Sequence, residues 1–302
     1  MSTFKPNADL EVPRGSTILV TGVSGMIAIH GVSAAIHCAS IVDFSGRIDE
    51  VVAPTVKGTT NILEAALANR DTVRSVDPRP GVRFHIGRDT WNEDAVDLVV
   101  RNTPPPAQQA GMGFQWGYAV YVASKIEAER AAWRFVEEQK RKGKKQTLPF
   151  RVNVTNPAMN WGKVMGSMGI SGGQVLSVLD GKVPPIPSVY IADTIDDERI
   201  HIATAIDSTV ANERIFVCDE PFNWRLVIEA MQKVLPDAEL PPTDPEEPLD
   251  ISTVDNALGA ALLRKWWGQP GYKGLEQTVR ETLEMCLEKR NGEYKRRAVT
   301  VE

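Results

Sequence analysis

The stretch Ser16-Thr-Ile-Leu-Val-Thr21, followed directly by Gly22-Val-Ser-Gly25-Met-Ile-Ala28, decides the fold. Its first part is short, apolar and β-branched, which predicts a buried parallel strand. Gly22 permits a tight turn, and Gly25 lets the backbone approach a pyrophosphate at the start of the next helix. The sequence therefore predicts the phosphate-binding turn of a dinucleotide-binding fold. The Gly-x-x-Gly-x-x-Ala spacing departs from the usual Gly-x-Gly-x-x-Gly and also suits a plain strand-to-helix turn.

A second signal is the segment Tyr121-Val-Ala-Ser-Lys125. The chain continues to Phe135 with good helix formers and without Gly or Pro, which predicts a helix. Side chains four residues apart lie on the same helix face, so the Lys125 ammonium favours the Tyr121 phenolate and lowers a pKa that is normally about 10. Such a phenol can exchange a proton near neutral pH. The alternative is an ordinary amphipathic helix with the tyrosine packed and the lysine solvated.

Together these residues resemble the extended short-chain dehydrogenase/reductases, in particular the group that includes dihydroflavonol reductase and fungal aldehyde and ketone reductases. The resemblance covers most of residues 16 to 290. Further segments match that group in order, namely Ala34-Ala-Ile-His-Cys-Ala-Ser40, Val56 to Ala66, Thr90-Trp-Asn-Glu93, Asn156-Pro157 and Glu220-Pro-Phe-Asn-Trp224. The resemblance implies an α/β fold: a Rossmann-like parallel sheet with helices on both faces, and a small C-terminal α/β substrate-binding region.

The resemblance also implies a reaction and a site. It implies an NADPH-dependent reductase, with NAD as the alternative cofactor, that reduces a ketone or aldehyde of secondary metabolism. Tyr121 and Lys125 are the implied catalytic residues, with Tyr121 as the acid/base. The implied cofactor-binding residues are Gly22, Val23, Ser24, Gly25, Met26, Ile27, Ala39, Ser40, Tyr121, Lys125 and Pro157. An NAD-dependent epimerase or dehydratase, which uses the same Tyr and Lys, is a weaker alternative.

Two departures from the family pattern concern this site. Between Ala28 and the strand near Ala34 the family has a helix, a strand, a second helix and a further strand, whereas this chain has only residues 29–33. We therefore expect the sheet to lack two or more strands. The Ser/Thr-rich segment whose hydroxyl holds the substrate carbonyl in the family is also missing. In this sequence Ser75 lies nearest to its position. A non-catalytic or truncated relative with an incomplete cofactor site is therefore the main alternative to a reductase.

The sequence predicts three regions. Residues 1–15 form an N-terminal tail, and residues 16–157 form a truncated NAD(P)-binding Rossmann region. Residues 158–302 form most of the substrate-binding region, with 189–218 returning to the core sheet through strands near 189–193 and 213–218. Residues 78–117 lack regular periodicity, which predicts an irregular segment that covers the site.

Composition narrows the class of protein and its partners. The chain has 302 residues, 42% of them apolar and 24% charged, and its net charge of −5 argues against a nucleic-acid-binding surface. We expect a small-molecule carbonyl substrate as partner, and a monomer or homodimer. Cys38, Cys218 and Cys286 have no paired spacing, which favours the reducing cytoplasm. The four histidines fit no metal-ligand motif, so no metal is predicted. The sequence has no run of about eighteen apolar residues, so no membrane-spanning helix is predicted.

Overall fold

The computed structural model describes most of the chain. For some residues within the ranges below it describes the backbone but not the side chain. The described residues are 17–21, 32–37, 41, 44–67, 83–142, 150–164 and 169–299. The predicted phosphate-binding turn at 22–28 lies outside them. In the described part of the chain, no helix is both long and apolar enough to cross a membrane.

Strands and helices alternate along the described chain. The strands are β1 (Thr17–Thr21), β2 (Val32–His37), β3 (His85–Ile86), β4 (Val154–Pro157), β5 (Met159–Trp161), β6 (Val189–Asp193), β7 (Arg214–Val217), β8 (Pro221–Phe222) and β9 (Thr253–Val254). The helical elements are α1 (Ile48–Leu67), α2 (Glu93–Val96), the π-helical turn η1 (Asp97–Arg101), α3 (Pro106–Met112), α4 (Phe114–Lys142), α5 (Gly169–Leu179), α6 (Thr194–Ile206), α7 (Trp224–Val234), α8 (Ala257–Trp267) and α9 (Leu275–Val299). This order confirms the predicted α/β class.

The described strands pair mainly in parallel. β1 pairs with β2, β4 with β7, β5 with β6 and β3 with β9, all in parallel, whereas β8 adds to β6 in the antiparallel direction. These pairs form four small sheets among the described residues. The chain passes from β1 to its parallel neighbour β2 through residues 22–31 alone, which is short for a crossover that usually takes a dozen or more residues.

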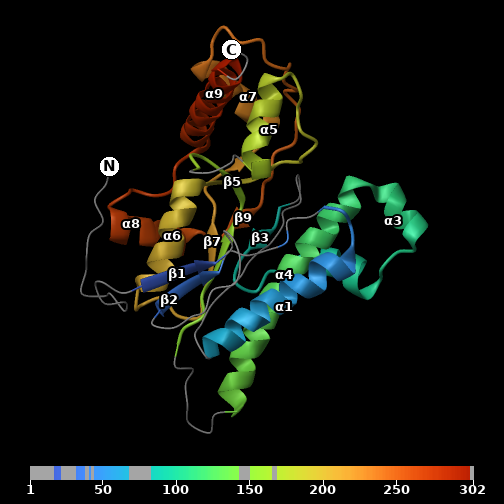
Figure 1. Cartoon of the computed structure of the whole chain (residues 1–302), viewed down its shortest axis with the longest axis vertical. Coiled ribbons are helices and arrows are strands. Elements are labelled where there is room, and N and C mark those ends of the chain that lie inside the picture. The colour runs from blue at the N-terminus through green and yellow to red at the C-terminus, as the bar shows by residue number, and fades with distance from the viewer. Residues whose placement is uncertain are drawn as a thin grey trace.

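Helices lie on both sides of the central strands (Figure 1). The long helices α1 and α4 lie side by side, and their apolar faces meet the start of β4 through Leu63, Ala132, Val136 and Phe150. On the opposite side, α6 and α8 pack against β7, with Ile200, Ile215 and Trp266 in a second core cluster. α5, α7 and α9 gather at one end of the molecule around a third cluster. The result is the helix–sheet–helix layering that buries parallel strands.

The expectation of an irregular segment before Tyr121 is wrong for residues 83–117, which are mostly helical. Pro106 occupies the first turn of α3, where its fixed φ suits a helix start and its missing N–H is not needed. Gly113, with φ at 55°, separates α3 from α4. Val99 of η1 is buried in a cluster with residues of α1 and α4, and Met112 of α3 packs on the same cluster, so tertiary packing rather than local periodicity stabilises these short helices.

Candidate functional site

The helix α4 brings Tyr121 and Lys125 together as the four-residue spacing predicts. The Lys125 ammonium nitrogen lies 5.3 Å from the centre of the Tyr121 ring. Lys125 is only 4% exposed, and Tyr121 is half-buried between the core residues Val122 and Ile126. Ser124, between them in sequence, donates its hydroxyl to the Tyr121 carbonyl oxygen at 2.7 Å. The lysine charge is therefore held inside the protein next to the phenol rather than in solvent.

Aromatic side chains surround one side of Tyr121. The Phe44 ring meets the Tyr121 ring edge to face, with centroids 5.3 Å apart. Phe44 also contacts Phe114 and Tyr118, whose rings stack on each other at 6.2 Å. Phe114 is 55% exposed, so this aromatic cluster extends from the surface to Tyr121. It offers an apolar surface next to the phenol.

One turn beyond Lys125, Glu129 forms a buried ion pair with Arg214 of β7. The Arg214 Nε lies 2.6 Å from Glu129 Oε1, a second guanidinium nitrogen lies 3.2 Å from Oε2, and both side chains are at most 3% exposed. Arg214 also donates to the carbonyl oxygens of Arg88 and Thr90 and stacks on the Trp91 ring at 4.2 Å. This two-pronged contact fixes α4 against the sheet, because a guanidinium and a carboxylate match in one planar arrangement.

The strand β4 ends with Asn156 and Pro157. Pro157 pairs with Val217 at the end of β7, so it lies at the carboxyl edge of two parallel strands, where open α/β sheets bind ligands. Asn156 is 4% exposed, and neither its Oδ1 nor its Nδ2 has a hydrogen-bond partner among the described residues. Thr155 has its side chain on the other face, where its hydroxyl lies 2.6 Å from His201.

The other predicted site residues lie outside the described part of the chain. They are Gly22, Val23, Ser24, Gly25, Met26, Ile27, Ala39 and Ser40, and the same holds for Ser75. Of the predicted set, the structure therefore describes Tyr121, Lys125 and Pro157. Sequence reasoning missed Glu129 and Arg214. The one available signal was the position of Glu129, four residues after Lys125 and so on the same helix face.

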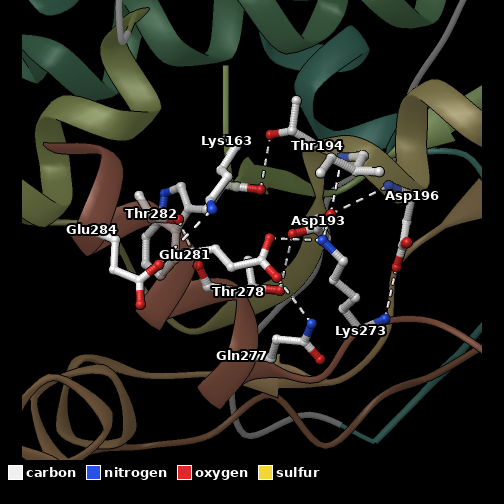
Figure 2. A network of polar contacts seen from close by, with 12 residues as sticks. Lys163, Asp193, Thr194, Asp196, Lys273, Gln277, Thr278, Glu281, Thr282 and Glu284 are labelled. Carbon is white, nitrogen blue, oxygen red and sulfur yellow. Dashed lines mark hydrogen bonds and ion pairs between the residues drawn. The ribbon is translucent and has the colours of Figure 1, made fainter. Parts of the chain in front are cut away.

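A second buried polar network ties α9 to the carboxyl end of β6 (Figure 2). The Lys273 ammonium nitrogen lies 3.0 Å from Asp193 Oδ1 and 2.8 Å from Glu281 Oε2. Asp193 also caps α6 by accepting the backbone N–H groups of Ile195 and Asp196. Burial alone would raise the pKa of Glu281, but hydrogen bonds from Lys273 and Gln277 outweigh it and lower that pKa. In this network one ammonium is shared by two carboxylates, which joins α9 to the carboxyl end of β6.

Carboxylates near this network have raised pKa values. Burial raises the pKa of Asp219 to about 6, and the negative charges of Glu220 and Asp196 add to the effect. Burial likewise raises the pKa of Asp196, although Gln269 and the backbone N–H of Lys273 donate hydrogen bonds that oppose the rise. The described residues contain no group of three or more His, Cys, Asp or Glu side chains arranged to hold a metal ion.

The chain is similar in sequence to several known reductases. No family model matches the chain. Aldehyde reductase 2 of Sporidiobolus salmonicolor is 28% identical over 270 residues, covering 84% of this chain and 74% of that protein. Ketoreductase adrE of Penicillium roqueforti is 29% identical over 270 residues, covering 83% and 74%. The chain is thus similar to reductases of the extended short-chain dehydrogenase/reductase group. Other relatives carry the name NAD-dependent epimerase/dehydratase.

A solved structure supports the same fold. The crystal structure of yeast methylglyoxal/isovaleraldehyde reductase complexed with NADPH superposes with a TM-score of 0.63 at 19% identity. The match covers 86% of this chain and 78% of that one. At this identity the likeness establishes the Rossmann-type fold alone. The substrate has to be argued from the site itself.

Proposed function

We propose that this protein is an NADPH-dependent reductase of an aldehyde or ketone, with Tyr121 as the acid that protonates the developing alkoxide. The observation that carries the proposal is the buried Lys125 ammonium, 5.3 Å from the Tyr121 ring centre on a helix fixed to the sheet. Its support also includes relatives named aldehyde reductase and ketoreductase, and a solved relative whose structure contains NADPH.

The residues present fit such a cofactor. Asn156 has two buried side-chain atoms without partners among the described residues, and it lies beside Pro157 at the carboxyl edge of the strands. When bound, NADPH supplies hydride to the substrate carbonyl carbon. Lys125 and Pro157 would hold its nicotinamide end. The residues Gly22, Val23, Ser24, Gly25, Met26 and Ile27 would hold its pyrophosphate, and Ala39 and Ser40 its ribose.

The described side chains account for the proton-transfer half of this reaction. As negative charge develops on the substrate oxygen, Tyr121 donates its phenolic proton there and becomes a phenolate. The nearby Lys125 ammonium stabilises that phenolate, and does so more strongly than in water because the lysine is buried. The Glu129–Arg214 pair keeps α4 in register with the sheet, so that the phenol does not drift from the strand edge. Phe44 excludes water from one side of the ring.

The test replaces Tyr121 by Phe and uses Tyr118→Phe, one turn earlier on the same helix, as the matched control. NADPH oxidation is followed with a panel of aliphatic and aromatic aldehydes and ketones. We expect Tyr121→Phe to lower kcat by about 10²–10⁴-fold, because it removes the general acid, while NADPH binding measured by fluorescence persists. Tyr118→Phe should retain activity. Undiminished turnover by Tyr121→Phe would refute the assigned role.

A second candidate function is that of a non-catalytic relative with an incomplete cofactor site. The observation that favours it is the short connection of residues 22–31 between β1 and β2. A fluorescence titration of the full chain with NADPH separates the two functions. Saturable binding of NADPH supports the reductase. The absence of binding at millimolar NADPH, a concentration at about the upper end of ordinary cofactor Kd values, supports the non-catalytic relative. Stable retention of NAD through purification would instead favour an epimerase or dehydratase.

We also propose that residues 16–157 form the cofactor-binding region and that residues 158–302 contribute most of the substrate-binding region. The pairing of β7 with β4 is consistent with residues 189–218 returning to the cofactor-binding sheet. We further propose that the partner is a small-molecule carbonyl compound and that the protein is a monomer or a homodimer. Both proposals rest on the same family resemblance.

A further inference from the structure

The segment that leads into β4, and β4 itself, direct alternate side chains toward α4. Phe150 and Val152 pack in one core cluster with Ala132 and Val136 of α4. Because successive residues of an extended chain point to opposite faces, residues 154 and 156 share the face of residues 150 and 152. The partner strand agrees, since Arg214, which pairs with Val154, reaches Glu129 of α4. Asn156 therefore faces α4.

The same contacts show in which direction β4 runs along α4. Phe150 and Val152 share a core cluster with Ala132 and Val136 of α4, whereas Arg214, the strand partner of Val154, reaches Glu129, which lies earlier on that helix. Two strand residues advance about 6.6 Å and one helical turn about 5.4 Å, so the next step along β4 corresponds to the next turn back along α4. The strand therefore runs toward the turn of α4 that carries Lys125, and Asn156 lies beyond Val154 in that direction.

Asn156 differs from the other buried asparagine of this segment, Asn153. Asn153 is 6% exposed, and its Nδ2 donates to the carbonyl oxygens of Thr204 and Val210 while its Oδ1 accepts the Glu213 N–H. Asn156 is equally buried, yet neither polar atom of its side chain has a partner among the described residues. A buried unsatisfied polar group is destabilising, so the folded protein alone gives no reason for an asparagine at this position.

We propose that the Asn156 side chain binds the carboxamide of the nicotinamide ring. This inference rests on the proposed function and adds a specific contact to it. A primary amide has two donor hydrogens and an acceptor oxygen, and the ligand group that satisfies both sides at once is another amide. The hydride-donating end of the cofactor must lie near Tyr121, and Asn156 directly precedes Pro157 at the carboxyl edge of β4 and β7. Asn156 is thus a cofactor-orienting residue that sequence reasoning did not single out.

The test compares Asn156→Leu with Asn153→Leu in the full chain. Without cofactor, Asn156→Leu should leave Tm unchanged or raise it, because leucine has a similar size and removes two unsatisfied groups. Asn153→Leu should lower Tm, because it removes hydrogen bonds to the carbonyl oxygens of Thr204 and Val210 and to the Glu213 N–H. A fall in Tm for both variants alike would show that Asn156 is structural and would overturn the proposal.

Cofactor binding gives the second readout. We expect Asn156→Leu to raise the Kd for NADPH about tenfold or more, as for one lost pair of buried hydrogen bonds. The 3-acetylpyridine analogue of NADPH, which has a methyl ketone in place of the carboxamide, should bind wild type more weakly than NADPH, whereas Asn156→Leu should bind the two cofactors about equally. Asn156→Ala gives the same comparison without the bulk of leucine.

The outcomes separate this inference from the proposed function. One outcome is that wild type binds and uses NADPH, while the Asn156 variants bind NADPH equally well or still prefer it over the analogue. This outcome would overturn the inference but leave the proposed reductase function intact. Wild type that binds no NADPH overturns both.

Discussion

Two buried ion networks hold two different helices, and their chemistry differs. At α4, Glu129 and Arg214 are at most 3% exposed and meet through a two-pronged contact, and Arg214 also donates to two backbone carbonyls. At α9, Lys273 is 12% exposed and divides a single ammonium between Asp193 and the 18% exposed Glu281. The first arrangement fixes one geometry, whereas in the second one ammonium shared by two carboxylates leaves more freedom of position.

This difference matches what each helix carries. α4 carries Tyr121 and Lys125, whose proposed roles require a fixed position relative to the end of β4. A displacement of about 1 Å can lower a reaction rate about 10²-fold, so a rigid guanidinium–carboxylate contact suits this helix. α9 closes the third core cluster through Leu275, Val279 and Leu283, and its ion network adds to an interface that is already apolar. The two networks should therefore respond differently to substitution.

Breaking the α4 network should have the largest effect. Glu129→Gln leaves the Arg214 guanidinium buried without a countercharge, so we expect it to lower the free energy of unfolding by about 3–5 kcal/mol. Urea denaturation measures this change. Glu137→Gln, on the same helix but paired with Lys140 at the surface, is the control and should leave the urea midpoint unchanged. Equal effects of the two substitutions would contradict a special role for the buried pair.

Breaking the α9 network should have a smaller effect. Lys273→Met removes the ammonium, but Asp193 keeps two backbone N–H donors, so we expect a loss of about 1–3 kcal/mol in the free energy of unfolding. Limited proteolysis should show earlier cleavage within α9, while the Kd for NADPH stays unchanged. Lys233→Met, which breaks only an exposed pair with Glu276, is the control. A loss of NADPH binding in Lys273→Met would show that this network also supports the site.

The smallest expected effect concerns Asp219 and depends on pH. Its pKa rises from 3.8 to about 6 on folding, so the folded protein holds this proton more tightly than the unfolded chain. That contribution to stability is present below about pH 4 and is lost as the pH rises through about 6. Asp219→Asn should therefore match wild type near pH 4. Above pH 6 the variant should be more stable than wild type by about 1–2 kcal/mol in the free energy of unfolding. This is less than the free energy that corresponds to the whole pKa shift, because Asp219 keeps some solvent contact. A difference in Tm that does not vary with pH would contradict this prediction.

Local elements were predicted well, because their signals lie within short segments. The strand at residues 17–21, the strand at 189–193 and the helix around Tyr121 follow from apolar runs and helix-forming composition. The helices between residues 93 and 112 were missed, because they are short, α3 contains Pro and Gly, and Val99 of η1 and Met112 of α3 pack on a cluster formed with α1 and α4. Tertiary contacts outweigh weak local propensity in such segments.

The amino-acid sequence by itself determined that Tyr121 and Lys125 meet, because four residues span about one helical turn and no distant partner is needed. Only the tertiary structure decided that Glu129 meets Arg214 across 85 positions of sequence, and that Asn153 is satisfied while Asn156 is not. The physical reason is that hydrogen-bond satisfaction and charge pairing depend on which elements pack together and in what register. Spacing along the chain does not encode that arrangement.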